Sequence, residues 1–303
     1  MLLTLRSHPK IVSYMLSIIK NLASRIKQRI APEPVIEPEP VEEAPTIFDY
    51  RGYEIPIRLI HLTGAGPEHF DNIAQLHWDE VARYAPLQPE HQILEVGCGI
   101  GRDAIWLTDF LDAQGAYTGI DIIADSIAWC RENISTRFPR FQFIHYDVHD
   151  PLHNPEGTIA TTDIHIPLAD GSLDRILLHS VFTHLFEKEI AHYLGEFQRL
   201  LKPDGLVYAS FFVVDEETLQ SALQSNNTPF NLTFQHPLGD GCYINDPESP
   251  AGAVAYTPET IRRLLQRAGL ALAQPIHYGY WSGLHPEAMD GQDILILRRG
   301  TKP

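Results

Sequence analysis

The sequence predicts an α/β fold, a doubly wound, seven-stranded and mostly parallel sheet that ends in a C-terminal antiparallel hairpin. Short apolar runs bounded by turn residues alternate with helical patterns along most of the chain, which is typical of a sheet with helices on both faces. The first such run, residues 92–96, leads directly into three alternating glycines. At 303 residues and 44% hydrophobic, the chain is long enough to bury a full core.

The periodicity predicts each element in turn, beginning with a helix over Pro67–Tyr84. The later elements are strand Gln92–Val96, helix Arg102–Ala113, strand Tyr117–Asp121, helix Ala124–Arg137, strand Phe141–Tyr146, strand Arg175–His179, helix Glu187–Leu201, strand Leu206–Val214, helix Pro258–Ala268, and strands near 270–280 and 292–298. Right-handed crossovers make the first five strands parallel, and the short connection 281–291 makes the last pair a hairpin. Residues 215–256 are expected to be irregular and are too long for a plain connection, so we interpret them as a substrate lid.

The glycine-rich turn is the strongest functional motif. Residues 93–101 read I-L-E-V-G-C-G-I-G, an apolar run that ends in an acid and then in Gly97, Gly99 and Gly101. Glycines let a ligand lie against the main chain, and the helix that follows points free N–H groups at the same place. A dinucleotide site has the spacing G-x-G-x-x-G, whereas here the third glycine comes one residue early and Arg102 fills the sixth position. The turn therefore fits S-adenosylmethionine better than NAD.

Two later strands also end in an acid. Asp121 ends the run A-Y-T-G-I-D, about 20 residues past the glycines, where a carboxylate can accept both ribose hydroxyls. Asp147 ends F-Q-F-I-H-Y-D, and its carboxylate, with the Val148 backbone, is suitably placed to recognise the adenine edge. A single strand-end Asp can equally be a turn or helix cap, but a series of such acids with a glycine turn favours a cofactor site.

These motifs, in this order, resemble the class I S-adenosylmethionine-dependent methyltransferases. The resemblance covers residues 66–299 and rests on E-V-G-C-G-I-G-R, G-I-D, Y-D-V, D-R-I-L-L-H-S-V-F-T-H-L and R-L-L-K-P-D-G. It implies a Rossmann-like methyltransferase fold with S-adenosyl-L-methionine as the cofactor. The cofactor-binding residues that it implies are Glu95, Gly97, Cys98, Gly99, Gly101, Asp121, Ile122, Asp147, Val148 and His179, the last through its backbone.

Further segments resemble a subgroup linked to modification of glycans or glycosylated metabolites. They are W-C-R-E-N-I, S-V-F-T-H-L, and Y-G-Y-W-S-G followed by Q-D-I-L-I-L. Asp204 stands where relatives usually carry Gly, which is a turn change of little consequence. Leu284 stands where we expect Arg, and this departure limits what the resemblance implies about the substrate.

His184 is the residue that we interpret as catalytic. It follows the fourth strand, near the expected position of the methyl group, and an imidazole titrates close to neutrality, as a base for a hydroxyl acceptor must. The alternative is a structural histidine at the start of the next helix. His145, His149 and His153 are spaced by four, but they fall on a strand end and a loop rather than on one helix face, so we predict no metal site.

Composition excludes several classes of function. A formal net charge of −16 opposes polyanions, so nucleic acid is not expected as a partner. Leu178-His179-Ser180 stand where enzymes that methylate base amino groups carry N/D-P-P-Y/F. The three cysteines, Cys98, Cys130 and Cys242, are widely spaced and indicate neither a disulfide framework nor a zinc site, which favours a reducing, cytoplasmic compartment.

The first 46 residues differ in character from the rest. Residues 1–30 contain six basic residues and no acid, with apolar residues at helical spacing, which predicts a basic amphipathic helix able to lie on an anionic membrane. Docking on a partner or on the chain's own catalytic domain, and a transit peptide, are the alternatives. Residues 31–46 form a Pro/Glu linker, and residues 47–303 form the methyltransferase domain.

The sequence thus predicts an O-methyltransferase of a small molecule or glycan, with a lipid-linked acceptor as one possibility. Methylation of a membrane quinone or another lipophilic phenol is a second hypothesis, and an inactive, membrane-tethered S-adenosylmethionine-binding module is a third. Tyr278, Tyr280 and Trp281 are candidates to stack on a sugar or an aromatic ring of the acceptor, although core packing explains such rings equally well.

Overall fold

Residues 46–225 and 231–300 are described by the computed structural model of the chain. The predicted amphipathic helix, residues 1–30, and residues 31–45 of the predicted linker lie outside this range. Within it, no helix combines the length and the apolar character needed to span a bilayer.

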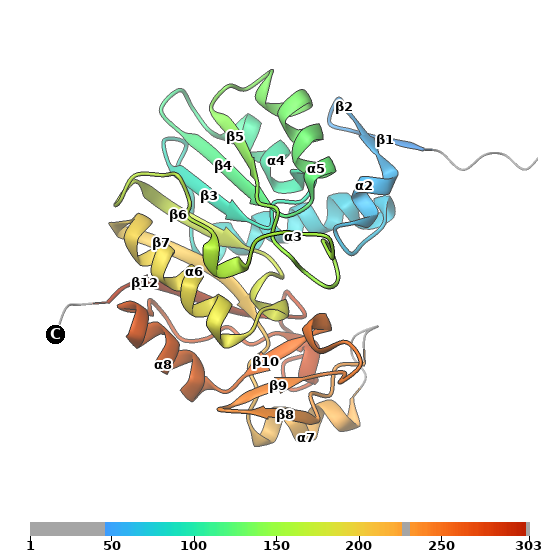
Figure 1. Ribbon diagram of the computed structural model, residues 1–303, viewed down its shortest axis with the longest axis vertical. Helices are drawn as coiled ribbons and strands as arrows, with labels where there is room; N and C mark the ends of the chain where they lie inside the picture. The colour runs from blue at the N-terminus through green and yellow to red at the C-terminus, as the bar shows by residue number, and fades with distance from the viewer. Residues whose placement is uncertain (1–45, 226–230, 301–303) are drawn as a thin grey trace, which may run out of the picture. The chain divides into compact units, whose positions relative to one another are not determined.

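Seven strands form the central sheet in the order β11-β12-β7-β6-β3-β4-β5 (Figure 1). The parallel strands are β3 (Gln92–Val96), β4 (Ala116–Asp121), β5 (Phe141–His145), β6 (Leu173–Leu178) and β7 (Leu201–Phe211). β12 (Asp293–Arg299) runs antiparallel between β7 and β11 (Leu270–Leu272). The predicted doubly wound, seven-stranded and mostly parallel sheet with its C-terminal antiparallel pair is therefore confirmed.

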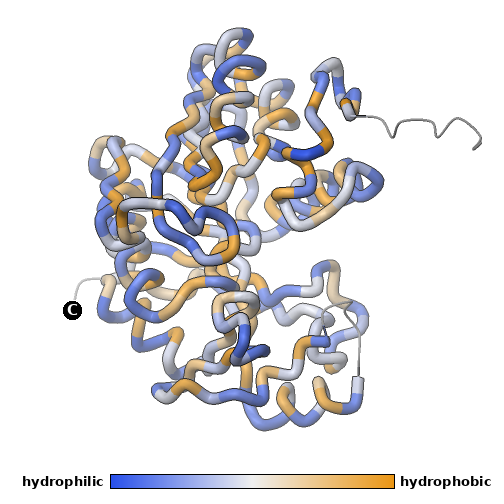
Figure 2. The backbone as a smooth tube through the Cα atoms, turned by 45° about the vertical axis from the view of Figure 1, so that its right-hand side comes forward, coloured by the Kyte–Doolittle hydropathy of each residue, from blue (hydrophilic) through white to orange (hydrophobic). Residues whose placement is uncertain are grey.

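Helices cover both faces of this sheet. α6 (Glu187–Leu200) and α8 (Pro258–Ala268) pack on one face in a single core cluster with β3, β6 and β7. α3 (Phe70–Tyr84), α4 (Arg102–Phe110) and α5 (Ala124–Cys130) form the cluster on the other face, and α5 continues as a π-helix over Arg131–Ser135. Hydrophobic and hydrophilic stretches alternate along the backbone, and hydrophilic stretches are prominent in the outer turns (Figure 2).

The ends of α8 follow directly from its local sequence, and its bounds match the prediction. The Thr257 hydroxyl accepts a hydrogen bond from the Thr260 N–H at 3.3 Å, which satisfies one of the free amides of the first turn. Pro258 occupies the first turn, where its missing N–H costs nothing. Gly269 ends the helix with a φ of 73°, a left-handed conformation that favours glycine.

Several short elements were not predicted. A hairpin of β1 (Ile47–Tyr50) and β2 (Tyr53–Pro56) and the helix α2 (Ile57–His61) precede the sheet. The segment expected to be irregular, 215–256, contains α7 (Glu216–Gln224) and a three-stranded antiparallel sheet of β8 (His236–Gly239), β9 (Cys242–Ile244) and β10 (Val254–Tyr256). Strands of three or four residues leave too little periodicity to be detected. Asp204, expected in a turn, is an exposed residue of β7.

Single 3-10 turns complete the fold at Pro67–His69, Thr161–Asp163, Phe182–His184, Pro250–Gly252 and Tyr280–Ser282. The turn at 182–184 directly follows β6, so it places His184 at the carboxyl edge of the sheet. From β3 the strands follow in sequence to β4 and β5 on one side, and the chain then returns to place β6 and β7 on the other side of β3. In doubly wound sheets, this switch point is where ligands bind.

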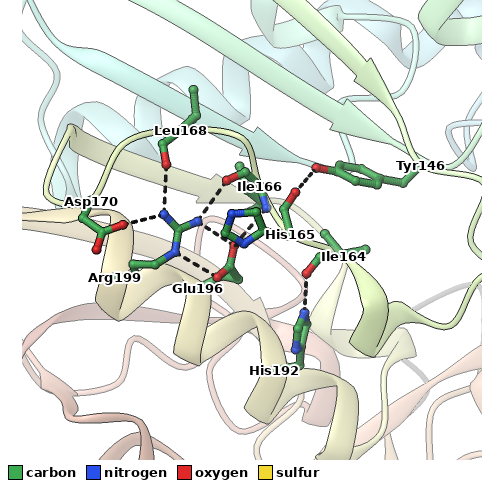
Figure 3. Close-up of polar contacts among 9 residues, drawn as sticks. All are labelled: Tyr146, Ile164, His165, Ile166, Leu168, Asp170, His192, Glu196 and Arg199. Carbon is green, nitrogen blue, oxygen red and sulfur yellow. Dashed lines mark hydrogen bonds and ion pairs between the residues drawn. The ribbon is translucent and has the colours of Figure 1, made fainter.

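The long loop after β5, residues 146–172, is anchored to α6 through Arg199 (Figure 3). The guanidinium donates to the carbonyl oxygens of Ile166 and Leu168, each at 2.9 Å. It also donates to the carboxylates of Glu196 and Asp170, each at 2.7 Å. The two carboxylates raise the pKa of Arg199 above its usual value, and the hydrogen bond to Glu196 makes the largest contribution.

We expect Arg199→Lys to destabilise the protein, because an ammonium cannot reproduce the planar fork that binds two carboxylates and two carbonyls. The free energy of unfolding should fall by about 1 to 3 kcal/mol, the usual range for hydrogen bonds to charged groups. Urea unfolding measures the change. The exposed Arg262→Lys is the matched control, and equal stability of the two variants would contradict an anchoring role.

We also expect Glu80→Gln to alter how stability depends on pH. Glu80 is 1% exposed and accepts a hydrogen bond from the Tyr208 hydroxyl; burial, aided by Asp290, raises the pKa of Glu80 to about 8. Because the pKa of Glu80 is higher in the folded state, protonation of this carboxyl stabilises the folded protein. This stabilisation is lost as pH rises from the ordinary pKa of glutamic acid through 8. Glutamine stays neutral, so the variant should match the parent at pH 5 and gain on the order of a few kcal/mol by pH 9.

Thermal melts of the parent and Glu80→Gln between pH 5 and 9 measure this difference, with the exposed Glu132→Gln as the control. A parallel pH dependence of all three proteins would show that Glu80 ionises normally in the folded state.

Candidate active site

A cavity of about 680 Å³ opens at the carboxyl ends of β3, β4 and β6. This volume is ample for a cofactor with a small acceptor. Its walls come from the glycine turn, the ends of β4 and β6, the loop after β5 and the 3-10 turn at 182–184. The far wall includes Phe212, Leu232, Asn245, Asp246 and Ala253, so part of the segment predicted as a substrate lid faces the cavity.

The glycine turn has the backbone geometry that the motif predicts. Gly97, Gly99 and Gly101 have φ values of 77°, 52° and 75°, which other residues rarely adopt. A Cβ at Gly97 would also meet the Val181 side chain at 2.6 Å. Gly97 and Gly99 line the cavity.

Gly101 also has a packing role. It is the N-terminal flanking residue of α4, and a Cβ there would meet Ile134 at 2.9 Å and Cys130 at 3.1 Å. The third glycine of such a turn allows α4 to approach its neighbour closely. Gly101 is not among the residues that line the cavity, and its contact with the cofactor stays a prediction.

Asp121 binds the turn from the neighbouring strand. One carboxylate oxygen accepts the Gly99 N–H at 2.7 Å, and the other accepts the Ile123 N–H at 2.8 Å. Each carboxylate oxygen can accept two hydrogen bonds, so capacity remains for ribose hydroxyls. Burial raises the pKa of Asp121, although the backbone N–H groups oppose this shift. Asp121 and Ile122 both line the cavity, as predicted residues of a cofactor site should.

Asp147 is bonded to the loop that follows β5. Its carboxylate accepts hydrogen bonds from the Thr158 hydroxyl at 2.7 Å and the Asn154 amide at 3.1 Å, and these bonds lower its pKa. The neighbouring Val148 lines the cavity, whereas Asp147 is not among the lining residues. Adenine recognition by the Asp147 carboxylate stays a prediction.

Glu95, Cys98 and His179 form the floor of the cavity. Glu95 accepts a hydrogen bond from the Tyr117 hydroxyl, and burial, followed by the charge of Asp103, raises its pKa well above the usual value. The His179 ring, expected to contribute only its backbone, stacks on His77 with centroids 3.6 Å apart. Burial lowers the pKa of His179 well below its usual value.

His77, Asp103 and His179 form one group with metal-ligand chemistry, and its ligand atoms lie within 4.8 Å of one another. His77 Nδ1 lies 2.7 Å from the Asp103 carboxylate. The two rings are nearly parallel, at 8°. Imidazole lone pairs lie in the ring plane, so stacked rings cannot direct them at one ion. We therefore interpret this group as a hydrogen-bonded His77–Asp103 pair with the His179 ring stacked on His77.

The three histidines spaced by four each have a separate partner. His145 bonds the Ile122 carbonyl, His149 the Pro155 carbonyl and His153 the Asp150 carboxylate. The three rings therefore bond to three different groups. Asp150 and His153, however, line the cavity together, and the sequence analysis assigned them no catalytic role. The spacing D-x-x-H after the third strand of the parallel series was the available signal.

Other cavity residues also escaped sequence analysis. Ser180 has a φ of 56° at the end of β6, and such strained residues often mark functional sites. Its N–H donates to the Ser210 hydroxyl at 2.8 Å, and its hydroxyl accepts from the Gln292 amide at 2.7 Å. Trp281, by contrast, is buried against Phe212, and its N–H donates to Asp293 at 2.9 Å. It belongs to the core and is not free to stack on an acceptor.

His184 lines the cavity on the side facing the loop after β5. Its Nδ1 lies 2.9 Å from the Ala251 carbonyl oxygen. Burial lowers the pKa of His184, and the charge of His153 acts in the same direction, while the hydrogen bond to Ala251 opposes both. The ring is therefore neutral near pH 7.

Comparison with known proteins agrees with this geometry. Residues 94–209 match a family model described as a methyltransferase domain. That range runs from β3 to β7 and includes the glycine turn and Asp121. Residues 94–209 thus form a methyltransferase domain. S-adenosylmethionine is accordingly the cofactor of this domain.

Two curated proteins are similar to parts of the methyltransferase chain. An arsenite methyltransferase of Aquipseudomonas alcaligenes is 29% identical over 192 residues, which cover 61% of this chain and 51% of that protein. The O-methyltransferase cnsE of Penicillium expansum is 28% identical over 156 residues, which cover 52% of this chain and 49% of that protein. The chain thus spans about half the length of these relatives.

Solved structures support the fold of the methyltransferase domain. The PH0226 protein of Pyrococcus horikoshii OT3 superposes with a TM-score of 0.50 over 77% of this chain and 92% of that chain. Its sequence identity is 14%, so the likeness concerns the fold alone.

We expect Asp121→Ala to weaken S-adenosylmethionine binding by about 1.5 to 3 kcal/mol, roughly 10- to 150-fold, because a carboxylate with free acceptor capacity is lost. Asp147→Ala is the matched comparison and should stay within about twofold of the parent, since Asp147 is not among the residues that line the cavity. Isothermal titration calorimetry measures both, with NAD as the ligand that should not bind. Equal losses would place the Asp147 carboxylate on the adenine after all.

Proposed function

We propose that the chain is an S-adenosylmethionine-dependent O-methyltransferase that acts on a hydroxyl group of a small molecule or glycan. The observation that supports this proposal is the tautomer of His184. A carbonyl oxygen only accepts, so the contact with Ala251 at 2.9 Å requires a proton on His184 Nδ1. In the neutral ring, Nε2 then carries a lone pair. A neutral imidazole in the wall of the cavity is the base that a hydroxyl acceptor needs.

The residues present fit the cofactor. Gly97 and Gly99 leave the turn without side chains, and the Asp121 carboxylate has acceptor capacity for the ribose. Bound S-adenosylmethionine supplies an activated methyl group, so the protein needs only to align the acceptor and remove its proton. His184 performs the second task, and residues of the segment 212–253 surround the acceptor.

An oxygen acceptor suits this cavity better than arsenite, the substrate in the name of one relative. Soft centres prefer thiolate ligands. Of the three cysteines in the chain, Cys98 alone lines the cavity. Burial raises the pKa of Cys98 well above its usual value, which keeps it a thiol.

Two parts of the cavity wall support the two acceptor classes considered. Asn245, Asp246 and Ser249 offer polar groups suited to a polyhydroxylated acceptor, in keeping with the glycan-linked subgroup that the sequence resembles. Leu185, Phe212 and Leu232 form an apolar part of the same cavity, which supports methylation of a lipophilic phenol or quinone as the second candidate. Membrane contact through residues 1–30, a lipid-linked acceptor and a cytoplasmic location remain predictions from the sequence.

We expect His184→Ala to lower turnover by roughly 10² to 10⁴, because a general base contributes about that much. Affinity for S-adenosylmethionine and the melting temperature should stay near the parental values. Formation of S-adenosylhomocysteine with a panel of phenols, catechols, sugars and arsenite measures the reaction, and the exposed His236→Ala is the control. Parental turnover in folded His184→Ala would remove this residue from the mechanism, and arsenite as the best acceptor would overturn the proposed substrate class.

A further inference from the structure

A second histidine lines the cavity beside His184. His153 belongs to the loop after β5, and its ring centroid lies 6.1 Å from that of His184, with the ring planes at 77°. The two rings come from segments that are far apart in the sequence but meet at the carboxyl edge of the sheet. The two rings therefore line the same part of the cavity.

His153 is held in one orientation by Asp150. One Asp150 carboxylate oxygen lies 3.0 Å from His153 Nδ1 and also accepts the N–H groups of Leu152 at 3.0 Å and His153 at 2.7 Å. Two backbone N–H groups thus hold the carboxylate in position next to the His153 ring. Because Nδ1 faces Asp150, the free nitrogen of His153 is Nε2.

The loop that carries Asp150 and His153 is itself anchored. Asp150 and Asn154 exchange two backbone hydrogen bonds of 3.0 Å, which close a small hairpin around His153. Further along, the Tyr146 hydroxyl donates to the His165 carbonyl and His192 donates to the Ile164 carbonyl, each at 2.7 Å (Figure 3). A catalytic group needs this kind of support to keep its geometry.

We propose that His153 is a second catalytic residue, which donates from Nε2 as an imidazolium to the acceptor oxygen while His184 takes the proton from that oxygen. The inference rests on the O-methyl transfer proposed above. The oxygen attacks the methyl carbon, the carbon–sulfur bond breaks, and its electron pair stays on sulfur as S-adenosylhomocysteine forms. The proton leaves from His184 to solvent, and His153 keeps its own proton throughout.

The charges around the two rings agree with these roles. The hydrogen bond to Asp150 raises the pKa of His153, burial opposes this, and the charges of Asp150 and Asp121 add to it. The pKa of His184 is lowered, mainly by burial. Environments that shift the pKa values of two titratable groups in opposite directions are typical of an acid and base pair. A cation beside the hydroxyl also favours its ionised form.

The decisive variant is Asp150→Asn, which keeps an oxygen for the backbone N–H groups but removes the negative charge. Parental turnover should rise with pH through the pKa of His184, below 6.5, and fall through that of His153, above 6.5. In Asp150→Asn the falling limb should move to lower pH, with a loss of roughly tenfold or more at pH 7 that is partly recovered at lower pH. If the falling limb of the pH profile were unchanged in Asp150→Asn, the proposed role of His153 as a charged donor would be overturned.

His153→Gln keeps a neutral donor but loses the charge, so turnover should fall roughly 10- to 100-fold and the falling limb should vanish, while the affinity for S-adenosylmethionine stays within about twofold. His149→Gln, on the same loop but bonded to Pro155, is the matched control. Weaker cofactor binding by His153→Gln with an unchanged pH profile would place His153 on the ribose and overturn the proposal.

Two readouts separate this inference from the proposed function. An NMR titration with S-adenosylhomocysteine bound should show His153 titrating above His184, and only His153 moving in Asp150→Asn; the reverse order would overturn the pair whatever the activity. The probe 4-nitrophenol should bind the parent as its coloured anion and His153→Gln in neutral form. A parent that binds the anion but methylates no hydroxyl would refute the proposed function while supporting the charged pair.

Discussion

The hydrogen bond from the Gly99 N–H to the Asp121 carboxylate is the constraint on which the cofactor site depends. It joins the turn after β3 to the end of β4 at 2.7 Å, so the backbone cannot move away from the neighbouring strand. The second oxygen of Asp121 fixes the start of the segment leading to α5 through Ile123. A buried carboxylate is stable only when such bonds satisfy it. The same group therefore stabilises the switch point of the sheet and presents acceptor capacity to the ligand.

Three largely buried carboxylates around the cavity are hydrogen-bonded to different partners. Glu95 is paired with the Tyr117 hydroxyl, and Asp103 with His77. Asp293 accepts from the N–H groups of Val213 and Gly279 and from Trp281, and burial raises its pKa to about 7. The floor and the far wall are thus held by hydrogen bonds, whereas Asp150 and His153 stand at the more exposed rim. An active site requires this rigid support so that the few groups that contact the substrate keep their geometry.

Sequence reasoning succeeded where local pattern decides the outcome. The runs at β3 and β4 and the helix α8 were predicted closely, because apolar periodicity, a Thr cap and a terminal Gly all act within a few residues. It failed for 215–256, where strands of three or four residues depend on pairing with one another. It also did not predict the partners of the Asp147 carboxylate, Asn154 and Thr158, because they come from a loop whose return path the sequence does not reveal.

By itself, the sequence determined the fold class, the glycine turn and the identity of the cofactor, because backbone freedom at Gly97 and Gly99 and a strand-end Asp121 are local properties. Tertiary structure alone decided which side chains meet. Gly101 lies close to Ile134, and Trp281 is held in the core by its hydrogen bond to Asp293. The meeting of His153 with His184 likewise depends on the separate anchoring of two segments at one sheet edge. Contacts between distant segments are set by packing, and no local pattern encodes them.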